Sequence, residues 1–302
     1  MEVSWQGVYP AVLTHFREDD SLDHEMFAVN TEAQIEAGID GIVLAGSLGE
    51  ASTLEQSEKN ELLKAGLDVV SGRIPVIMNI AEQSLKAALR AVSDAEKLGA
   101  DGLMLLPPLR YFADSLESLE YFRAIASATS LPLMIYNNPV DYKIEVTLDM
   151  FESLAEYPNV QAVKESTRNI SNIIRMQNRF GKRFKLLTGV DPLAFENLCI
   201  GADGWVAGLC DAFPAETVAI YDLVKAGRTK EALDIYRWFL PLLELDLHPK
   251  LVQNIKLAAT MTGIGSEVVR APRLKLAGAE RERVIQIIES SLANRPALTP
   301  VD

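Results

Sequence analysis

The stretch LGADGLM at residues 98–104 recurs in two related forms, AGIDGIV at residues 37–43 and IGADGWV at residues 200–206. In each form a helical pattern ends at the first glycine, and an apolar run follows the Asp-Gly pair. A first glycine suits the left-handed position after a helix, and Asp-Gly favours a tight turn. The repeat therefore predicts units in which a helix leads directly into a strand.

Short apolar runs of this kind alternate with stretches that carry apolar residues at helical spacing. Eight runs have the character of strands: residues 7–14, 41–46, 75–80, 102–107, 131–137, 160–166, 184–189 and 204–209. Eight strand-helix units over about 200 residues are what a parallel (β/α)8 TIM barrel requires. An open doubly wound sheet is the main alternative, but no G-x-G-x-x-G motif follows a strand.

The pattern after residue 209 is helical only, over residues 215–225, 230–245, 250–261 and 279–292. We therefore expect two regions. Residues 1–212 would form the (β/α)8 barrel core, and residues 213–302 would form the last barrel helix and a C-terminal helical extension.

Composition limits the classes of function. The 302 residues are 48% hydrophobic and 24% charged, with a net charge of -13. This charge argues against a nucleic-acid partner, because a phosphate backbone needs a basic face. Neither a signal peptide nor an apolar stretch of about 18 residues is visible, so we expect no membrane partner. Only two cysteines are present, which suits a reducing compartment, and we expect a cytoplasmic protein.

One lysine has a position that suggests chemistry. Lys164 follows the apolar run 160–163, so it would stand at the C-terminal end of a buried strand. Burial lowers the pKa of an ammonium group and leaves a free amine that can attack a carbonyl carbon. Considered alone, such a lysine more often reaches the surface or pairs with a neighbour such as Glu165. Barrel active sites lie at the C-terminal strand ends, which favours Lys164 over Lys185, the residue that opens the next strand.

Other strand ends supply partners for this lysine. Tyr136 would carry protons during imine formation with a 2-oxo or 2-imino acid, and Ser47 is a hydroxyl of suitable reach to assist it. The backbone amides of Ser47, Leu48 and Gly49 would hold a substrate carboxylate. Each residue also has a structural interpretation, in which Tyr136 is a core tyrosine and the glycines serve only a turn.

Two other kinds of catalysis find no support in the sequence. The three histidines, His15, His24 and His248, share no metal-ligand spacing. A G-x-S-x-G nucleophile elbow is also missing. We therefore expect neither a metal nor another cofactor.

Four motifs together resemble the dihydrodipicolinate synthase and N-acetylneuraminate lyase family. They are GSLGE at residues 46–50, YN-x-P at 136–139, VKE at 163–165 and G-x-x-G at 201–204, in the order and spacing of that family. The resemblance extends from residue 7 to about residue 292. It implies a (β/α)8 barrel with a helical extension, usually a homotetramer, that uses a Schiff-base lysine.

The same resemblance implies roles for individual residues. Lys164 takes the place of the lysine, Tyr136 that of the proton-relay tyrosine, and Ser47 that of the first hydroxyl in the carboxylate loop. Tyr111, at altered spacing from the family's tyrosine pair, would be a third relay member. Asp141 stands where the synthase carries an arginine for a second carboxylate, which argues against lysine biosynthesis.

Further stretches resemble a narrower branch, the 1-pyrroline-4-hydroxy-2-carboxylate deaminases of hydroxyproline breakdown. They are SL at 47–48, GWVAGL at 204–209, HPKLVQNIK at 248–256 and RAPRL at 270–274. We therefore predict a Schiff-base lyase that converts this cyclic imine into 2,5-dioxopentanoate and ammonia. The residues expected to bind substrate are Leu48, Gly49, Glu50, Tyr111, Asn138, Trp205 and Gly208, with Leu48 or Trp205 shaping the pocket against larger sugar acids.

Other functions remain open at this point. The first is an aldolase or dehydratase of sialic acid or 2-keto-3-deoxy sugar acids, whose hydroxylated tail would need polar groups such as Asn138 and Asp191. The second is an enzyme like 4-hydroxy-tetrahydrodipicolinate synthase. The third, a non-catalytic barrel that binds a keto acid, is disfavoured because Lys164, Tyr136 and Ser47 occur together.

Overall fold

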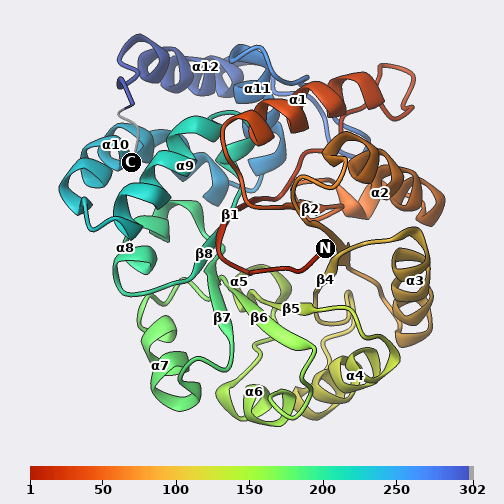
Figure 1. Cartoon of the computed structure of the whole chain (residues 1–302). Coiled ribbons are helices and arrows are strands. Elements are labelled where there is room, and N and C mark those ends of the chain that lie inside the picture. Colours follow the sequence, from red (N-terminus) through yellow and green to blue (C-terminus); the bar gives the residue numbers. More distant parts are fainter. Residues whose placement is uncertain (299–302) are drawn as a thin grey trace.

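Eight parallel strands form the centre of the molecule in a computed structural model that describes residues 1–298 (Figure 1). Residues 299–302, the end of the predicted second region, lie outside the described part. The strands are β1 Gly7–Pro10, β2 Ile42–Leu44, β3 Val76–Ile80, β4 Gly102–Leu105, β5 Leu133–Asn137, β6 Val160–Glu165, β7 Lys185–Thr188 and β8 Gly204–Ala207. The order β1-β8-β7-β6-β5-β4-β3-β2 closes where the N–H of Val12 donates to the Val43 carbonyl at 3.0 Å. The predicted (β/α)8 barrel is confirmed.

Helices surround these strands on the outside (Figure 1). The barrel helices are α1 His24–Glu36, α2 Gln56–Val70, α3 Leu85–Leu98, α4 Ser115–Ala128, α5 Pro139–Tyr142, α6 Leu148–Leu154, α7 Ser171–Phe180, α8 Ala194–Cys199 and α9 Pro214–Lys225. The extension contains α10 Thr229–Leu243, the 3-10 helix η4 Glu244–Leu247, α11 Leu251–Met261 and α12 Gly278–Ala293. Three shorter 3-10 helices are η1 Ala51–Thr53, η2 Asp191–Leu193 and η3 Leu209–Asp211. Within residues 1–298, no helix combines the length and apolar character needed to cross a membrane.

The repeated Asp-Gly turns have a structural role at the N-terminal rim of the barrel. The first glycine of each repeat is left-handed, with φ between 94° and 104°. The side chains of Asp40, Asp101 and Asp203 each accept a hydrogen bond from a backbone N–H of the preceding strand, at 2.8 to 2.9 Å. A buried N–H without a partner is costly, so each aspartate fastens its own turn to the neighbouring strand.

The strands are shorter than the apolar runs that predicted them, mainly at their C-terminal ends. The run at residues 41–46, for example, leaves the sheet after Leu44 because Ala45 has a left-handed φ of 52°. The Nδ2 of Asn79 on β3 donates to the Ala45 carbonyl at 2.8 Å and holds this bend. The residues that follow are therefore free to form loops over the mouth of the barrel.

Candidate active site

Lys164 lies at the C-terminal end of β6, inside the mouth of the barrel, with 7% of its surface exposed. It is in register with Tyr136 on β5, and its Nζ stands 4.1 Å from the centre of the tyrosine ring. Gly189, directly after β7, makes room for it. A Cβ atom at that glycine would lie 2.6 Å from the Cε and Cγ of Lys164, so a larger residue would displace the lysine.

The environment of Lys164 favours its neutral form. Burial is the largest effect and lowers its pKa from 10.5 to about 8, although the carboxylates of Asp246, Asp191 and Asp141 act in the opposite direction. A lysine with this pKa is an amine in a substantial fraction of molecules near neutral pH. Such an amine is a nucleophile for a carbonyl or imine carbon.

This pKa predicts the pH dependence of adduct formation. The free-amine fraction rises with pH, so trapping of pyruvate on Lys164 with borohydride should accelerate about 50-fold from pH 6 to pH 8 and level off above pH 9. Initial rates of adduct formation, followed by mass spectrometry, would measure this profile. A rate that continues to climb tenfold per pH unit beyond pH 9 would indicate an ordinary lysine.

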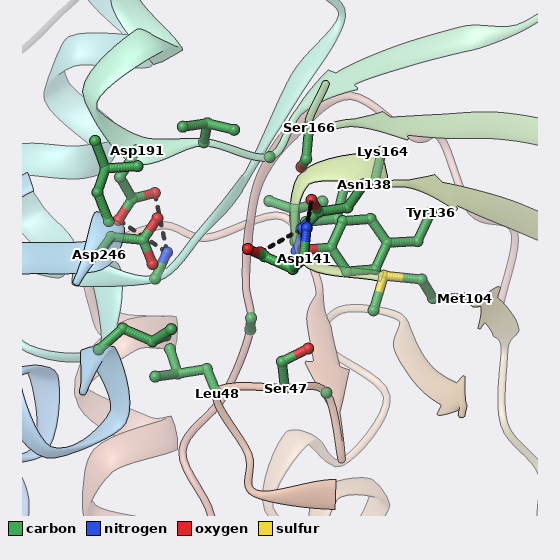
Figure 2. Close-up of a pocket in the computed structure, with 18 of the residues that line it drawn as sticks. Ser47, Leu48, Met104, Tyr136, Asn138, Asp141, Lys164, Ser166, Asp191 and Asp246 are labelled. Atoms are coloured by element: carbon green, nitrogen blue, oxygen red, sulfur yellow. Dashed lines mark hydrogen bonds between the residues drawn. The ribbon is translucent and has the colours of Figure 1, made fainter. Parts of the chain in front are cut away.

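A pocket opens above Lys164 at the C-terminal face of the strands (Figure 2). Lys164 and Tyr136 lie on one side of it, and Asp191 and Asp246 lie on the opposite side. The loop after β2 forms another edge. Of the residues predicted from the sequence, six contribute to this lining: Ser47, Leu48, Tyr136, Asn138, Lys164 and Gly208.

Tyr136 is buried, and its hydroxyl accepts a hydrogen bond from Asn138 Nδ2 at 3.0 Å. Burial raises its pKa, so the phenol stays protonated near neutral pH. Ser47 was expected to assist Tyr136 directly. In the structure, Ser47 Oγ is hydrogen bonded to the hydroxyl of Tyr142 instead. The rings of Tyr136 and Tyr142 meet edge to face at 5.7 Å. Ser47 thus reaches Tyr136 only through a second tyrosine, which the sequence analysis did not single out.

The loop GSLGE, residues 46–50, is held by its surroundings. Thr14 Oγ1 donates to the Gly49 carbonyl at 2.6 Å, and a Cβ atom on Gly49 would lie 2.9 Å from the Val12 carbonyl oxygen. Within residues 1–298, no carbonyl accepts a hydrogen bond from the N–H groups of Ser47, Leu48 or Gly49. These N–H groups are thus available to an anion at the edge of the pocket.

Glu50 has a different position from the one expected of a substrate-binding residue. It is fully buried outside the pocket lining, and its Oε1 pairs with Nζ of the equally buried Lys256 on α11 at 2.6 Å. Arg273 approaches its other oxygen at 3.5 Å. Glu50 therefore connects the loop after β2 to the extension rather than touching the pocket.

Removal of this buried partner is expected to destabilise the fold. A Lys256→Met variant leaves the Glu50 carboxylate in the interior without its nearest cation, which costs about 3–5 kcal/mol in comparable buried pairs. The free energy of unfolding in urea measures the effect. Lys250→Met serves as the control, because its pair with Glu280 lies at the surface and should matter little. Equal stability of the two variants would contradict the prediction.

Three other predicted residues, Gly49, Tyr111 and Trp205, also lie outside the pocket lining. Tyr111 is 61% exposed, and its hydroxyl donates to the carboxylate of Glu117 on α4 at 3.1 Å. Trp205 is buried in β8, and its Nε1 donates to Asp191 Oδ1 at 2.9 Å. Trp205 thus acts on the pocket only through the carboxylate that it holds.

Three polar residues that line the pocket are not among those named from the sequence: Asp246, Ser166 and Arg168. Asp246 belongs to η4 of the extension, so no pattern near the strand ends points to it. Ser166 follows Lys164 by two residues, and its hydroxyl lowers the pKa of Tyr136 through a side-chain hydrogen bond. Arg168 lines the pocket and approaches Asp141 Oδ1 at 3.7 Å. The alternation of side chains along β6 could have identified Ser166 from the sequence. Residues two apart share one face of a strand, so Ser166 lies on the same side as Lys164.

The model of the dihydrodipicolinate synthetase family matches residues 4–291, nearly the whole chain. The chain belongs to this family. Within it, the 4-hydroxy-tetrahydrodipicolinate synthase of Geotalea uraniireducens is 30% identical over 94% of this chain and 98% of its own length. An uncharacterized DapA-like lyase of Rhizobium meliloti is 31% identical over 91% of this chain and 92% of its own length.

Solved structures of this family agree in fold. The 4-hydroxy-tetrahydrodipicolinate synthase of Methylacidiphilum fumariolicum SolV superposes with a TM-score of 0.90 at 28% identity, over 96% of this chain and 97% of the other. The dihydrodipicolinate synthase of Acinetobacter baumannii, solved with pyruvate, gives a TM-score of 0.90 at 26% identity, over 95% of this chain and 99% of the other. As a member of the dihydrodipicolinate synthetase family, the chain is a Schiff-base-forming lyase.

Proposed function

We propose that this lyase deaminates 1-pyrroline-4-hydroxy-2-carboxylate, with Lys164 as the nucleophile. The observation that carries the proposal is the charge around the lysine. Three acidic side chains, those of Asp141, Asp191 and Asp246, line the pocket of Lys164 and act on its pKa, although burial raises the pKa of Asp246 and favours its neutral form. A substrate with a second carboxylate would meet repulsion here, whereas one with a single carboxylate and a basic nitrogen would be attracted.

Each part of the pocket has a role in this proposal. The free N–H groups of Ser47, Leu48 and Gly49 bind the one carboxylate of the substrate. Lys164 adds to C2 of the cyclic imine, and Tyr136, whose hydroxyl is held by Asn138, moves protons at the new C–N bond. Leu48 closes the apolar edge of the pocket.

The atoms balance over the whole reaction. Addition of Lys164 to C2 and cleavage of the bond between C2 and the ring nitrogen give an open chain with an amino group on C5. Loss of the 4-hydroxyl as water leaves an unsaturated C5 amine, which tautomerises to an imine. Hydrolysis of that imine releases ammonia, and hydrolysis of the Schiff base releases 2,5-dioxopentanoate. One water is lost and two are added, so one is consumed.

A second candidate, an enzyme like 4-hydroxy-tetrahydrodipicolinate synthase, is favoured by one residue. Arg168 lines the pocket and would attract a second carboxylate on the substrate. Its neighbour Asp141 reduces this attraction, because the two side chains approach to 3.7 Å. Deamination of a substrate with one carboxylate therefore requires that the guanidinium group of Arg168 stays paired with the Asp141 carboxylate.

One experiment tests both candidates. The enzyme is incubated with pyruvate or with the hydroxypyrroline carboxylate, reduced with borohydride and mapped by peptide mass spectrometry, while ammonia release is assayed in parallel. We expect an adduct on Lys164 with both compounds, and ammonia from the hydroxypyrroline only. Aldol condensation or cleavage without ammonia release would favour the synthase-like or sugar-acid alternatives.

Assembly and location are further proposals. We propose a homotetramer, supported by three large apolar side chains that remain at the surface: Tyr111, Phe112 and Leu116. Such a patch is commonly covered by another subunit. Light scattering on the purified protein would give its mass.

The two free cysteines, Cys199 and Cys210, support a cytoplasmic location.

A further inference from the structure

Asp246 reaches the pocket from outside the barrel. It belongs to η4, yet its side chain lines the pocket on the side opposite Lys164 (Figure 2). It meets Asp191 above Gly208, because a Cβ atom on that glycine would lie 3.1 Å from Asp246 Oδ1 and 3.3 Å from Asp191 Oδ2. Two carboxyl groups from two separate elements therefore converge on one spot of the pocket wall.

Asp191 is fully engaged by the protein. Its Oδ1 accepts from Trp205 Nε1 at 2.9 Å, and its Oδ2 accepts from the Leu209 N–H at 2.7 Å. The Gly208 N–H stands 3.1 Å from both oxygens. Burial raises the pKa of Asp191, and these donors act in the opposite direction by stabilising its charged form. They leave Asp191 little capacity for a substrate.

Asp141 is also engaged. Asn138 Nδ2 donates to its Oδ2 at 2.7 Å, and Arg168 approaches its Oδ1 at 3.7 Å. By contrast, the backbone N–H of Asp191 is the only group in residues 1–298 that donates to Asp246. Of the three carboxyl groups, Asp246 has the largest capacity left for a ligand.

Burial favours the neutral form of both Asp246 and Lys164. Burial and the nearby Asp191 raise the pKa of Asp246 to about 8, while burial lowers the pKa of Lys164 to about 8. These directions favour a free amine on one side of the pocket and a carboxylic acid on the other.

A second feature gives the pocket wall another polar group. Ser166 is 2% exposed, lines the pocket, and acts on the pKa of Tyr136 through a side-chain hydrogen bond. A hydroxyl has one donor and two acceptor positions, so Ser166 has capacity for a polar group of a ligand as well as for Tyr136. Figure 2 shows this side chain directed into the pocket beside Lys164.

We propose that Asp246 is the acid that protonates the ring nitrogen of a cyclic 2-imino acid while Lys164 displaces that nitrogen from C2. The inference rests on the function proposed above and assigns a group to its ring-opening step. The same carboxylate then holds the ammonium group that ring opening creates on the substrate.

The step balances as follows. The Nζ lone pair of Lys164 forms a bond to C2, and the π electrons of the ring imine move to the ring nitrogen. Asp246 gives its proton to that nitrogen. The bond between C2 and the ring nitrogen breaks, its electron pair stays on the departing amine, and the Nζ lone pair forms the new iminium bond. The departing amine takes up both protons that Nζ carried, one before the bond breaks and one from the iminium afterwards. It becomes an ammonium group facing the Asp246 carboxylate, and the Schiff base is left as a neutral imine.

The test compares two probes on matched variants. Pyruvate has no ring nitrogen, whereas 1-pyrroline-2-carboxylate has one and lacks the 4-hydroxyl. Asp246→Asn removes the acidic proton with little change of shape. Glu244→Gln removes one charge from the same 3-10 helix at an exposed position outside the pocket. Trapping with borohydride at pH 7, where Asp246 largely keeps its proton, tests the ring-opening step, and the pyruvate adduct of each variant corrects for the amine fraction of its Lys164.

We expect D246N to form the pyruvate adduct within about threefold of the wild-type rate. Its ring-opened adduct with the pyrroline, and its ammonia release from the hydroxypyrroline, should fall about 100-fold, the usual scale of general acid catalysis. E244Q should match the wild type with every probe. The retained pyruvate adduct also shows that D246N is folded.

Two results would overturn the inference alone. One is an unchanged ring-opened adduct in D246N, and the other is an equal loss with both probes, which would make Asp246 a positioning residue for Lys164. A wild-type enzyme that traps pyruvate but neither opens the pyrroline nor releases ammonia would reject the proposed function, and this inference with it. The behaviour of the wild type therefore separates the two failures.

Discussion

Replacement of Lys164 by arginine is expected to abolish the borohydride-trapped adduct and to lower turnover by about 10⁴-fold or more, the scale found when a covalent nucleophile is removed. Arginine keeps a cation in the pocket beside Asp191 and Asp246. Its guanidinium group stays protonated at any accessible pH, however, and offers no lone pair for addition to C2. The loss would therefore report the missing nucleophile rather than a missing charge.

Lys185→Arg is the matched control for this variant. Lys185 lies on the adjacent strand β7 but at the opposite rim, where its Nζ pairs with Asp203 Oδ1 at 3.0 Å. We expect its activity to stay within twofold of the wild type. Mass mapping adds a second check, because Lys256 also has a pKa lowered to about 8 by burial. An adduct on the peptide that contains Lys256 would refute the assignment of Lys164.

Phenylalanine at position 136 is expected to lower kcat by about 10²-fold to 10³-fold, because the proton carrier at the new C–N bond is lost. The ring and its contact with Lys164 Nζ at 4.1 Å remain. The hydrogen bonds with Asn138 and Ser166 disappear, which changes stability by about 1–2 kcal/mol. Steady-state kinetics together with urea unfolding would separate the catalytic effect from the structural one.

Tyr121→Phe is the control for this second variant. Tyr121 is a buried tyrosine on α4 whose hydroxyl has no partner among the described residues. Its removal should leave kcat unchanged. If Y136F keeps kcat within threefold while Tyr142→Phe loses more, the proton path runs through Tyr142 and Ser47 instead.

The position of Lys164 was accessible from sequence because it depends on local order along the chain. An apolar run ending in a lysine, within a chain of eight strand-helix units, determines both its burial and the rim on which it lies. The Asp-Gly repeats locate the turns of the opposite rim by the same logic. Such features need only the pattern of a strand and the direction in which it points.

Asp246 and the Ser47–Tyr142 contact were not accessible in this way. Asp246 follows a helix of the extension, and its approach to Gly208 depends on how η4 packs against η2. Glu50 illustrates the converse error. It stands in the motif at residues 46–50, but a lysine 206 residues away in the chain draws its carboxylate into the interior. Contacts between distant segments decide both cases.

The extension thus contributes to the mouth of the barrel twice, through Lys256 beneath the loop after β2 and through Asp246 on the pocket wall. The strands carry the nucleophile, and a separate module completes its surroundings. Exchange of η4 between relatives would retune which substrates are accepted while the reactive lysine stays untouched, a route to new activities that leaves the barrel sheet intact.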